Sequence, residues 1–253
     1  MHYINVRKLL GRQPEPKLSF VIAGAQKCGT SALYLYLRSH PQLYLSEKKA
    51  LRFFLGRKQN WLWPRYDALH AHFRDARPGQ VLGEATPKYI YSGTAMKRIA
   101  DYNPSMKIIM LVRDPVERAY SQWKMYTSVG MEDRPFSEAI RKENKHGYVG
   151  RGMYAAQLRR ATSLLGRDSI LVLTNDELRN DHTSALKRVT GFLAVEPFLK
   201  APEHSIKVPK EPRLATSPMT EDDIAFLTST YAADMKEFAA MTGIAFPRFQ
   251  ALA

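Results

Sequence analysis

The feature that most constrains the fold is a glycine loop between an apolar run and a helical segment near the start of the chain. Residues 18–23 read Leu-Ser-Phe-Val-Ile-Ala, an apolar run typical of a buried strand. The loop Gly24-Ala-Gln-Lys-Cys-Gly29 follows, and Ser31 begins a segment to Arg38 with leucines at helical spacing. A strand, a tight glycine loop and a helix, in this order, open a nucleotide-binding α/β unit.

Apolar runs and helical segments alternate along the rest of the chain. We expect further strands at 43–45, 81–82, 107–112 and 170–173, and helices at 117–126, 157–165, 183–193 and 220–241. Buried strands that alternate with helices are typical of a parallel sheet covered on both faces. The sequence therefore predicts a single P-loop-like α/β domain over 1–253, with a central parallel sheet flanked by helices and an N-terminal leader at 1–17.

Composition and charge limit the classes of partner. The 38 Lys and Arg residues outnumber the 24 Asp and Glu, and the net charge of +14 attracts polyanions. No basic cluster stands out, so we do not expect nucleic-acid binding. The seven histidines form no metal-ligand pattern, so no metal site is expected. No sequence feature predicts an oligomeric state.

Cysteine use and hydropathy limit the compartment. The single cysteine, Cys28, excludes an internal disulfide and gives no reason to expect an oxidising environment. The N-terminal residues lack the apolar core of a secretory signal, and no apolar run approaches the length of a membrane span. We therefore expect a cytoplasmic protein without a membrane span.

The glycine loop departs from the P-loop pattern of kinases at its lysine. The kinase pattern is G-x-x-x-x-G-K-S/T, but here Thr30 follows Gly29 and the lysine is Lys27, three residues earlier. A kinase loop needs its lysine on the β- and γ-phosphates and its hydroxyl on magnesium. The displaced lysine instead favours a single 5′-phosphate that carries one transferable group, with no obligatory metal. The loop N–H groups and the helix start would bind this anion.

Two motifs resemble those of sulfotransferases that use 3′-phosphoadenosine 5′-phosphosulfate (PAPS). The segment Ala25-Gln-Lys-Cys-Gly-Thr-Ser-Ala32 is similar to their 5′-phosphosulfate loop, and 111–121, Leu-Val-Arg-Asp-Pro-Val-Glu-Arg-Ala-Tyr-Ser, to their second cofactor motif. Phe53-Phe54 and the segment 83–89, Gly-Glu-Ala-Thr-Pro-Lys-Tyr, resemble landmarks of the bacterial and heparan-sulfate-type branch. The resemblance implies that PAPS donates a sulfuryl group to a hydroxyl of a carbohydrate or another hydroxylated metabolite, so the expected acceptor is a glycan.

The resemblance also implies roles for individual residues. Lys27 would bridge the 5′-phosphate and the sulfuryl group and neutralise the leaving oxygen, while Arg113 and Ser121 would hold the 3′-phosphate. A guanidinium fork and a nearby hydroxyl suit a phosphate on chemical grounds as well. An alternative is that Arg113 and Asp114 form an ion pair at a strand end. The full set of expected cofactor-binding residues is Ala25, Gln26, Lys27, Cys28, Gly29, Thr30, Ser31, Arg113, Ser121, Tyr154, Lys210 and Arg213.

Two charged positions of this branch are missing. Ala50 stands where relatives commonly carry a glutamate as catalytic base, and Ala85 where heparan-type relatives have a lysine. A base must still accept the proton of the acceptor hydroxyl. Glu84 is our first candidate because it follows the 81–82 strand at the edge where such folds bind ligands. Glu47 is the second candidate and His40 is the next; alternatively, Glu84 is a structural carboxylate of a loop or helix cap.

Two other functions remain open from the residues alone. A P-loop kinase of a small metabolite would need a magnesium-binding acid at a strand end, and Asp114 could supply one. A non-catalytic module that binds a nucleotide or polyanion is the other alternative, and Ala50 favours it. Trp61 and Trp63 either line an acceptor groove or pack under a loop.

Overall fold

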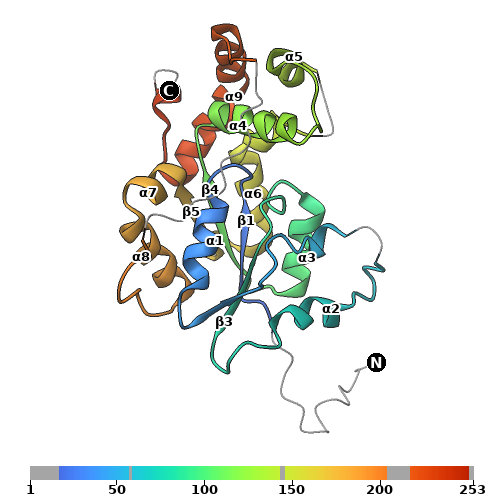
Figure 1. Cartoon of the computed structure of the whole chain (residues 1–253), viewed down its shortest axis with the longest axis vertical. Coiled ribbons are helices and arrows are strands. Elements are labelled where there is room, and N and C mark those ends of the chain that lie inside the picture. The colour runs from blue at the N-terminus through green and yellow to red at the C-terminus, as the bar shows by residue number, and fades with distance from the viewer. Residues whose placement is uncertain (1–16, 57–58, 143–145, 204–216, 251–253) are drawn as a thin grey trace.

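A five-stranded parallel sheet forms the centre of the protein (Figure 1). The computed structural model describes residues 17–56, 59–142, 146–203 and 217–250. The strands are β1 (Phe20–Gly24), β2 (Leu43–Leu45), β3 (Val81–Ala85), β4 (Lys107–Val112) and β5 (Ile170–Thr174). Their order across the sheet is β2-β3-β1-β4-β5, and every neighbouring pair is parallel. The predicted parallel sheet is therefore confirmed.

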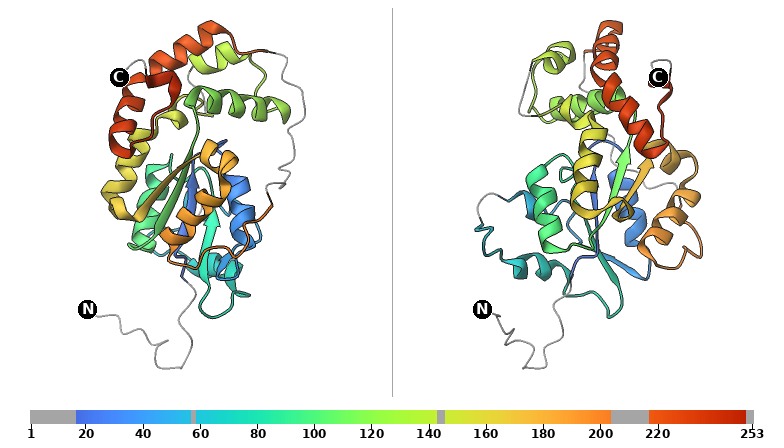
Figure 2. Two further views of the ribbon diagram at one scale, coloured as in Figure 1. Left: turned by 90° about the vertical axis from the view of Figure 1, so that its left-hand side faces the viewer. Right: turned by 180° about the vertical axis from the view of Figure 1, so that it is seen from behind.

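Helices cover both faces of the sheet. Figure 2 shows α1 (Thr30–Arg38) and α8 (His182–Leu193) on one face, and α3 (Gly93–Tyr102) and α6 (Tyr154–Leu165) on the other. The expected helices at 31–38, 157–165 and 183–193 therefore form, and α6 begins three residues earlier than predicted. The connections carry α2 (Tyr66–His70), α7 (Asn175–Asn180) and short 3-10 turns, among them η2 (Phe53–Leu55) and η4 (Gly150–Gly152).

A further group of helices lies beyond the carboxyl ends of the strands. It consists of α4 (Pro115–Ser128), α5 (Phe136–Arg141) and α9 (Glu221–Thr242), with the short α10 (Pro247–Gln250) after α9 (Figures 1 and 2). The helix α4 packs against both α5 and α9, and α9 packs along α6. These helices form a wall above the sheet edge where the glycine loop emerges.

The central strands are fully buried, which explains why their sequences are continuous apolar runs. All residues of β1 and nearly all of β4 are inaccessible to solvent. Close packing also favours glycine in β3, because a Cβ on Gly83 would lie 2.2 Å from the ring of Phe20 on the neighbouring strand. Burial of this kind holds the loop ends of β1, β3 and β4 in fixed positions, and the candidate site is built on those ends.

The two tryptophans have different environments. Trp61 packs against Phe53 and Phe54, and the guanidinium carbon of Arg98 lies 3.8 Å above its ring. The packing interpretation is therefore correct for Trp61, whereas Trp63 is exposed. No helix within the described residues is both long and apolar enough to cross a bilayer.

Candidate active site

The glycine loop leaves the carboxyl end of β1 and bends tightly before α1. The Ala25 N–H donates to the Leu111 carbonyl of β4 at 2.7 Å, which fixes the loop to the neighbouring strand. Lys27 and Gly29 adopt left-handed conformations, with φ of 73° and 92°. A Cβ on Gly29 would lie 2.6 Å from the amide nitrogen of Asn175, the first residue of α7. The left-handed conformation therefore favours glycine at position 29, and a side chain there would force the Asn175 amide to shift.

The first turn of α1 offers unpaired N–H groups to an anion. Gly29 is the N-cap, no side chain caps the helix, and no acidic residue lies in its first turn. The Ala32 and Leu33 N–H groups already donate to the Gly29 carbonyl. The N–H groups of Gly29, Thr30 and Ser31 therefore have no intrahelical acceptor. These N–H groups and the positive end of the helix dipole lie where the sequence predicts a bound anion.

The buried side chain of Tyr154 contacts Cys28 of the loop. The Tyr154 hydroxyl donates to the Arg113 carbonyl at 2.9 Å and lies 3.5 Å from Cys28 Sγ. Burial raises the pKa of the Cys28 thiol to about 11, so it is not a thiolate nucleophile at neutral pH. Tyr154 is fully buried. It therefore links the two cofactor motifs through their backbone and side chains, as a support beneath them.

Arg151 in η4 contacts the loop from the other side. Its Nη1 donates to Gln26 Oε1 at 3.0 Å, and its Nε donates to the His146 carbonyl at 2.8 Å. Only 8% of Arg151 is exposed, and burial lowers its pKa. The second cationic neighbour, Arg118 of α4, is fully buried and donates to Gln122 and to the Tyr148 carbonyl. No acidic side chain among the described residues pairs with either guanidinium.

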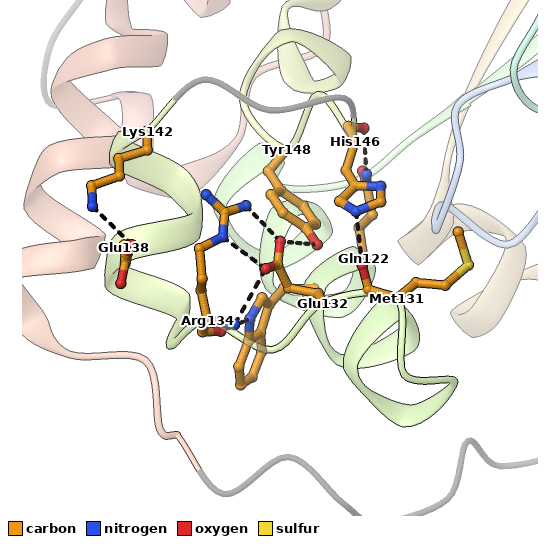
Figure 3. A network of polar contacts seen from close by, with 9 residues as sticks. Gln122, Met131, Glu132, Arg134, Glu138, Lys142, His146 and Tyr148 are labelled. Atoms are coloured by element: carbon orange, nitrogen blue, oxygen red, sulfur yellow. Dashed lines mark hydrogen bonds and ion pairs between the residues drawn. The ribbon is translucent and has the colours of Figure 1, made fainter.

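A polar network fixes the segment that holds these arginines (Figure 3). Glu132 accepts two hydrogen bonds from the Arg134 guanidinium, each at 2.8 Å, and one from the Tyr148 hydroxyl at 3.1 Å. Hydrogen bonding to the Arg134 side chain is the main cause that lowers the pKa of Glu132 to about 2. His146 is held by Met131 and Gln122, at 3.0 and 2.8 Å. The carbonyls of 146–148 are therefore rigid acceptors for the arginines behind the loop.

The second motif begins where β4 ends. Asp114 caps α4 by accepting from the Val116 and Glu117 N–H groups, and its other oxygen pairs with Arg248 Nε at 2.9 Å. Arg113 pairs with Glu117 at 2.9 Å and keeps 29% of its side chain exposed. The expected alternative, an ion pair between Arg113 and Asp114, is wrong because Asp114 serves the helix start and the C-terminal segment. Ser121 is half-buried, about two helical turns into α4.

A lysine that the sequence analysis did not single out lies over the start of α1. Lys49 Nζ donates to Ser31 Oγ, and the Lys49 and Lys27 charges interact. Lys49 follows β2, and backbone contacts hold the next residues to the end of β3: the Ala50 N–H donates to the Ala85 carbonyl at 2.9 Å. Ala50 and Arg52 have φ of 60° and 57°, so this segment turns twice through the left-handed region.

Glu84 lies beneath this turned segment and is fully buried. Its Oε2 accepts from the Thr86 hydroxyl at 2.9 Å, and Thr86 Oγ1 in turn accepts from the Arg52 N–H at 3.2 Å. Burial raises the pKa of Glu84 to about 7, although Tyr89, Thr86 and the Leu51 amide favour the charged form. Its Oε1 has no hydrogen-bond partner of good geometry among the described residues. Glu84 is thus a carboxyl group that changes protonation near neutral pH.

The other proposed bases lie in different surroundings. Glu47 is exposed on the segment after β2, and its carbonyl accepts from the Tyr34 hydroxyl of α1 at 2.7 Å. His40 lies at the opposite end of α1 from the glycine loop. Both of its ring nitrogens are engaged, one with the Glu196 carbonyl at 2.9 Å and the other with the Gln42 N–H at 3.2 Å. His40 therefore serves as a structural residue.

The structure describes most, but not all, of the expected cofactor-binding residues. Lys210 and Arg213 lie outside the described residues, whereas the loop residues, Arg113 and Tyr154 all come together at the carboxyl edge of the sheet. The described ranges bring no three His, Cys, Asp or Glu side chains into a group that could hold a metal ion.

The chain is similar to known sulfotransferases. The sulfotransferase domain family matches residues 18–214. Human heparan sulfate glucosamine 3-O-sulfotransferase 3B1 is 28% identical over 187 residues, which cover 70% of this chain and 46% of the human protein. Mouse bifunctional heparan sulfate N-deacetylase/N-sulfotransferase 4 is 29% identical over 204 residues, 70% of this chain and 22% of the mouse protein. The chain thus spans less than half the length of these curated relatives.

A solved structure agrees over a larger share of the chain. The crystal structure of a sulfotransferase from Alicyclobacillus acidocaldarius superposes with a TM-score of 0.80 at 26% identity, and covers 93% of this chain and 99% of that one. The family match includes the glycine loop, the turned segment after β2 and the Arg113 motif. From its sequence, its fold and the geometry of this loop, the chain belongs to the sulfotransferase domain family.

Proposed function

We propose that the protein transfers the sulfuryl group of PAPS to a hydroxyl of a carbohydrate or another hydroxylated metabolite. The observation that carries this proposal is the uncapped start of α1 beside cationic side chains from four parts of the chain. Lys27 belongs to the loop itself, Lys49 contacts Ser31, Arg151 contacts Gln26, and Arg113 interacts electrostatically with Cys28. A donor with several negative charges suits this concentration of positive charge.

Different residues would bind the two phosphate-bearing ends of the nucleotide. The N–H groups of Gly29, Thr30 and Ser31 would bind the 5′-phosphate, and Lys27 would neutralise the charge that develops on its bridging oxygen. Arg113 and Ser121 would bind the 3′-phosphate, for which Arg113 would exchange its partner Glu117 or share its fork with it. Tyr154 would act as a positioning residue, because it supports both motifs from a fully buried place.

The reaction breaks one sulfur–oxygen bond and forms another. The acceptor oxygen attacks sulfur, the bond to the 5′-phosphate oxygen breaks, and 3′-phosphoadenosine 5′-phosphate (PAP) leaves with the bonding electron pair. The acceptor hydroxyl gives its proton to a base. We propose Glu84 for this role, directly or through Thr86, since its pKa of about 7 suits proton exchange at neutral pH. Exposed Glu47 is the alternative base.

The contacts of Asp114 disfavour the alternative that the protein is a P-loop kinase. Its carboxylate caps α4 and pairs with Arg248, so it does not face the loop as a magnesium-binding acid would. Thr30 also occupies the position of the kinase lysine. We therefore propose that the protein's own cations neutralise the donor and that sulfuryl transfer needs no metal.

The acceptor and the compartment belong to the same proposal. The names of the curated relatives, heparan sulfate sulfotransferases, support a glycan acceptor, and the net charge of +14 is compatible with an acidic one. The only cysteine is buried as a thiol, which supports our expectation of a reducing, cytoplasmic location.

The affinity for PAP relative to AMP tests the cofactor assignment. We expect calorimetry to give a much tighter dissociation constant for PAP, because Arg113 and Ser121 add charge-assisted hydrogen bonds worth about 1.5–3 kcal/mol each. Arg113→Ala should remove most of this preference, whereas Arg65→Ala, at an exposed arginine paired with Asp67, should leave it unchanged. Equal affinities of the unmodified protein for the two nucleotides would contradict the assignment.

A further inference from the structure

Lys49 is a half-buried ammonium whose hydrogen-bond partner carries no charge. Its Nζ donates to Ser31 Oγ in the first turn of α1, which no side chain caps. No carboxylate within the described residues pairs with it. A charge held in this way lacks the compensation that a partly buried cation normally requires. The arrangement is therefore complementary to an anion at the start of α1.

The backbone holds Lys49 in this place. The Ala50 N–H donates a hydrogen bond to the Ala85 carbonyl, and the Arg52 N–H donates one to the Thr86 hydroxyl. This hydroxyl in turn donates to the carboxyl group of buried Glu84. Ala50 and Arg52 themselves adopt left-handed backbone conformations. Lys49 is thus presented by a segment anchored to the end of β3, and its approach to Ser31 does not depend on a freely moving loop.

The surroundings of Lys49 disfavour its charged form. Burial first, and the nearby positive charge of Lys27 second, lower the pKa of Lys49 to about 8. No carboxylate contributes to this shift. Ser31 is uncharged, Glu84 is buried at the end of β3 and shares its hydrogen bond with Thr86, and Glu47 is exposed on the same segment as Lys49. An anion between the two lysines would stabilise both ammonium groups.

We propose that Lys49 is a second cationic ligand of the 5′-phosphosulfate, beside Lys27, and that it takes up a proton when the nucleotide binds. The inference rests on the proposed cofactor and adds a residue and a linkage to it. Bound phosphate replaces the missing counter-charge and donates nothing back, since its oxygens are acceptors only. The neutral amine, which a fraction of the free molecules carries, becomes an ammonium in the complex.

The sign of the linkage follows from the two states of the protein. The free protein has the lower pKa at Lys49 and the complex the higher one, so the complex binds more protons at any pH between these values. Nucleotide affinity is therefore highest below pH 8 and weakens as the pH rises above the pKa of the free protein. At pH 8 about half of the free Lys49 side chains are neutral, so binding should take up about half a proton.

Calorimetry with PAP measures this uptake directly. Titrations of the full chain at pH 8 in two buffers with different ionisation enthalpies give the number of protons exchanged on binding. The phosphates of PAP are almost fully ionised at this pH, because a phosphate monoester has its second pKa near 6. We expect an uptake of about half a proton for the unmodified protein and a decline in affinity from pH 7 to pH 9.

Three variants separate charge from proton uptake. Lys49→Met should weaken PAP binding about 10- to 100-fold and abolish the uptake, because it removes a charge-assisted contact. Lys49→Arg should keep most of the affinity but show no uptake, since a guanidinium stays charged throughout this range. Lys48→Met is the matched control on the exposed neighbour and should change neither quantity.

The outcomes distinguish this inference from the cofactor proposal. If the unmodified protein and Lys49→Arg bind PAP no better than AMP, the cofactor assignment fails. If the unmodified protein binds PAP tightly but Lys49→Met has the same affinity and the same proton uptake, the role of Lys49 is wrong. The arginine variant keeps the test decisive even if Lys49→Met does not fold, because retained uptake in it would also contradict the proposal.

Discussion

Burial shifts the ionisation of three side chains around the loop, and each shift has a different chemical consequence. The pKa of Cys28 is raised to about 11, so this side chain remains a thiol. The pKa of Glu84 is raised to about 7, so this carboxyl group exchanges its proton near neutral pH. The pKa of Lys49 is lowered to about 8, so this side chain loses part of its charge in the free protein. In each case the charged form is disfavoured by removal from water. These shifts mark Glu84 and Lys49 as the groups whose charge can change during the reaction cycle.

The base is tested by amidation of the two candidate carboxylates. We expect Glu84→Gln to lower the turnover of sulfuryl transfer about 10²- to 10⁴-fold with little change in PAP affinity, as loss of a general base does. Glu47→Gln, at an exposed position, should keep near-normal turnover. Steady-state rates over pH 5–9 measure both. Near-normal turnover of Glu84→Gln would refute its assignment, and a collapse confined to Glu47→Gln would identify Glu47 as the base.

The pH dependence of the free energy of unfolding tests independently whether the pKa of Glu84 is raised in the folded protein. Its folded pKa of about 7 exceeds its ordinary value of 4.5, so the native state binds more protons than the unfolded state between these values. The free energy of unfolding should therefore fall as pH rises from 4.5 to 7, by up to about 3 kcal/mol from this group. Glu84→Gln should flatten that slope in denaturant titrations. A flat slope in the unmodified protein would show that Glu84 ionises normally.

At the scale of elements, the unit formed by β1, the glycine loop and α1 concentrates the functional geometry. The uncapped helix start requires Gly29 in a left-handed conformation with Asn175 against it. The β4–α4 turn provides the second motif, and its cap Asp114 fixes the direction in which Arg113 leaves the strand. Both motifs are sharp turns between a strand and a helix. Small backbone changes in them should therefore lower ligand affinity more than they lower the stability of the core.

Two glycines with similar backbone conformations test whether a change in the loop affects ligand binding more than stability. Gly29 and Gly79 have similar φ, 92° and 86°, but an added Cβ meets Asn175 at 2.6 Å in the first and no atom within 4 Å in the second. Alanine at either position should cost about 1–2 kcal/mol of stability for the left-handed conformation. Only Gly29→Ala should also lower PAP affinity by tenfold or more. Equal PAP affinities of the two variants in calorimetry would contradict the proposed loop site.

The elements were largely predictable from sequence because their signals are local. The apolar run 107–112 and the periodic segment 183–193 match β4 and α8 closely, and the order of the glycine loop and Arg113 motifs indicated one binding edge. Lys49 and Arg151 were not predicted as site residues. Lys49 contacts Ser31, 18 positions earlier in the chain, and Arg151 contacts Gln26, 125 positions earlier. Neither contact leaves a periodic pattern in the sequence.

On the scale of the whole molecule, the site is assembled from segments that are far apart in sequence. The loop, the segment after β2, the end of β4 and η4 each contribute a cation, and the wall of α4, α5 and α9 lies above them (Figure 1). This convergence explains how a chain with a net charge of +14 concentrates positive charge where an anionic donor would bind. It also supports a mechanism in which protein cations, without a metal, neutralise the departing phosphate.

Transfer of radiolabelled sulfuryl from PAPS to a panel of glycans in excess EDTA tests the proposed reaction itself. We expect that label enters an acceptor, that PAP forms in equal amount, and that Lys27→Ala lowers the rate about 10²- to 10³-fold, as removal of one charge-stabilising donor does. Tight PAP binding without label in any acceptor would contradict the proposed transfer, and so would a transfer that stops under EDTA and resumes with magnesium.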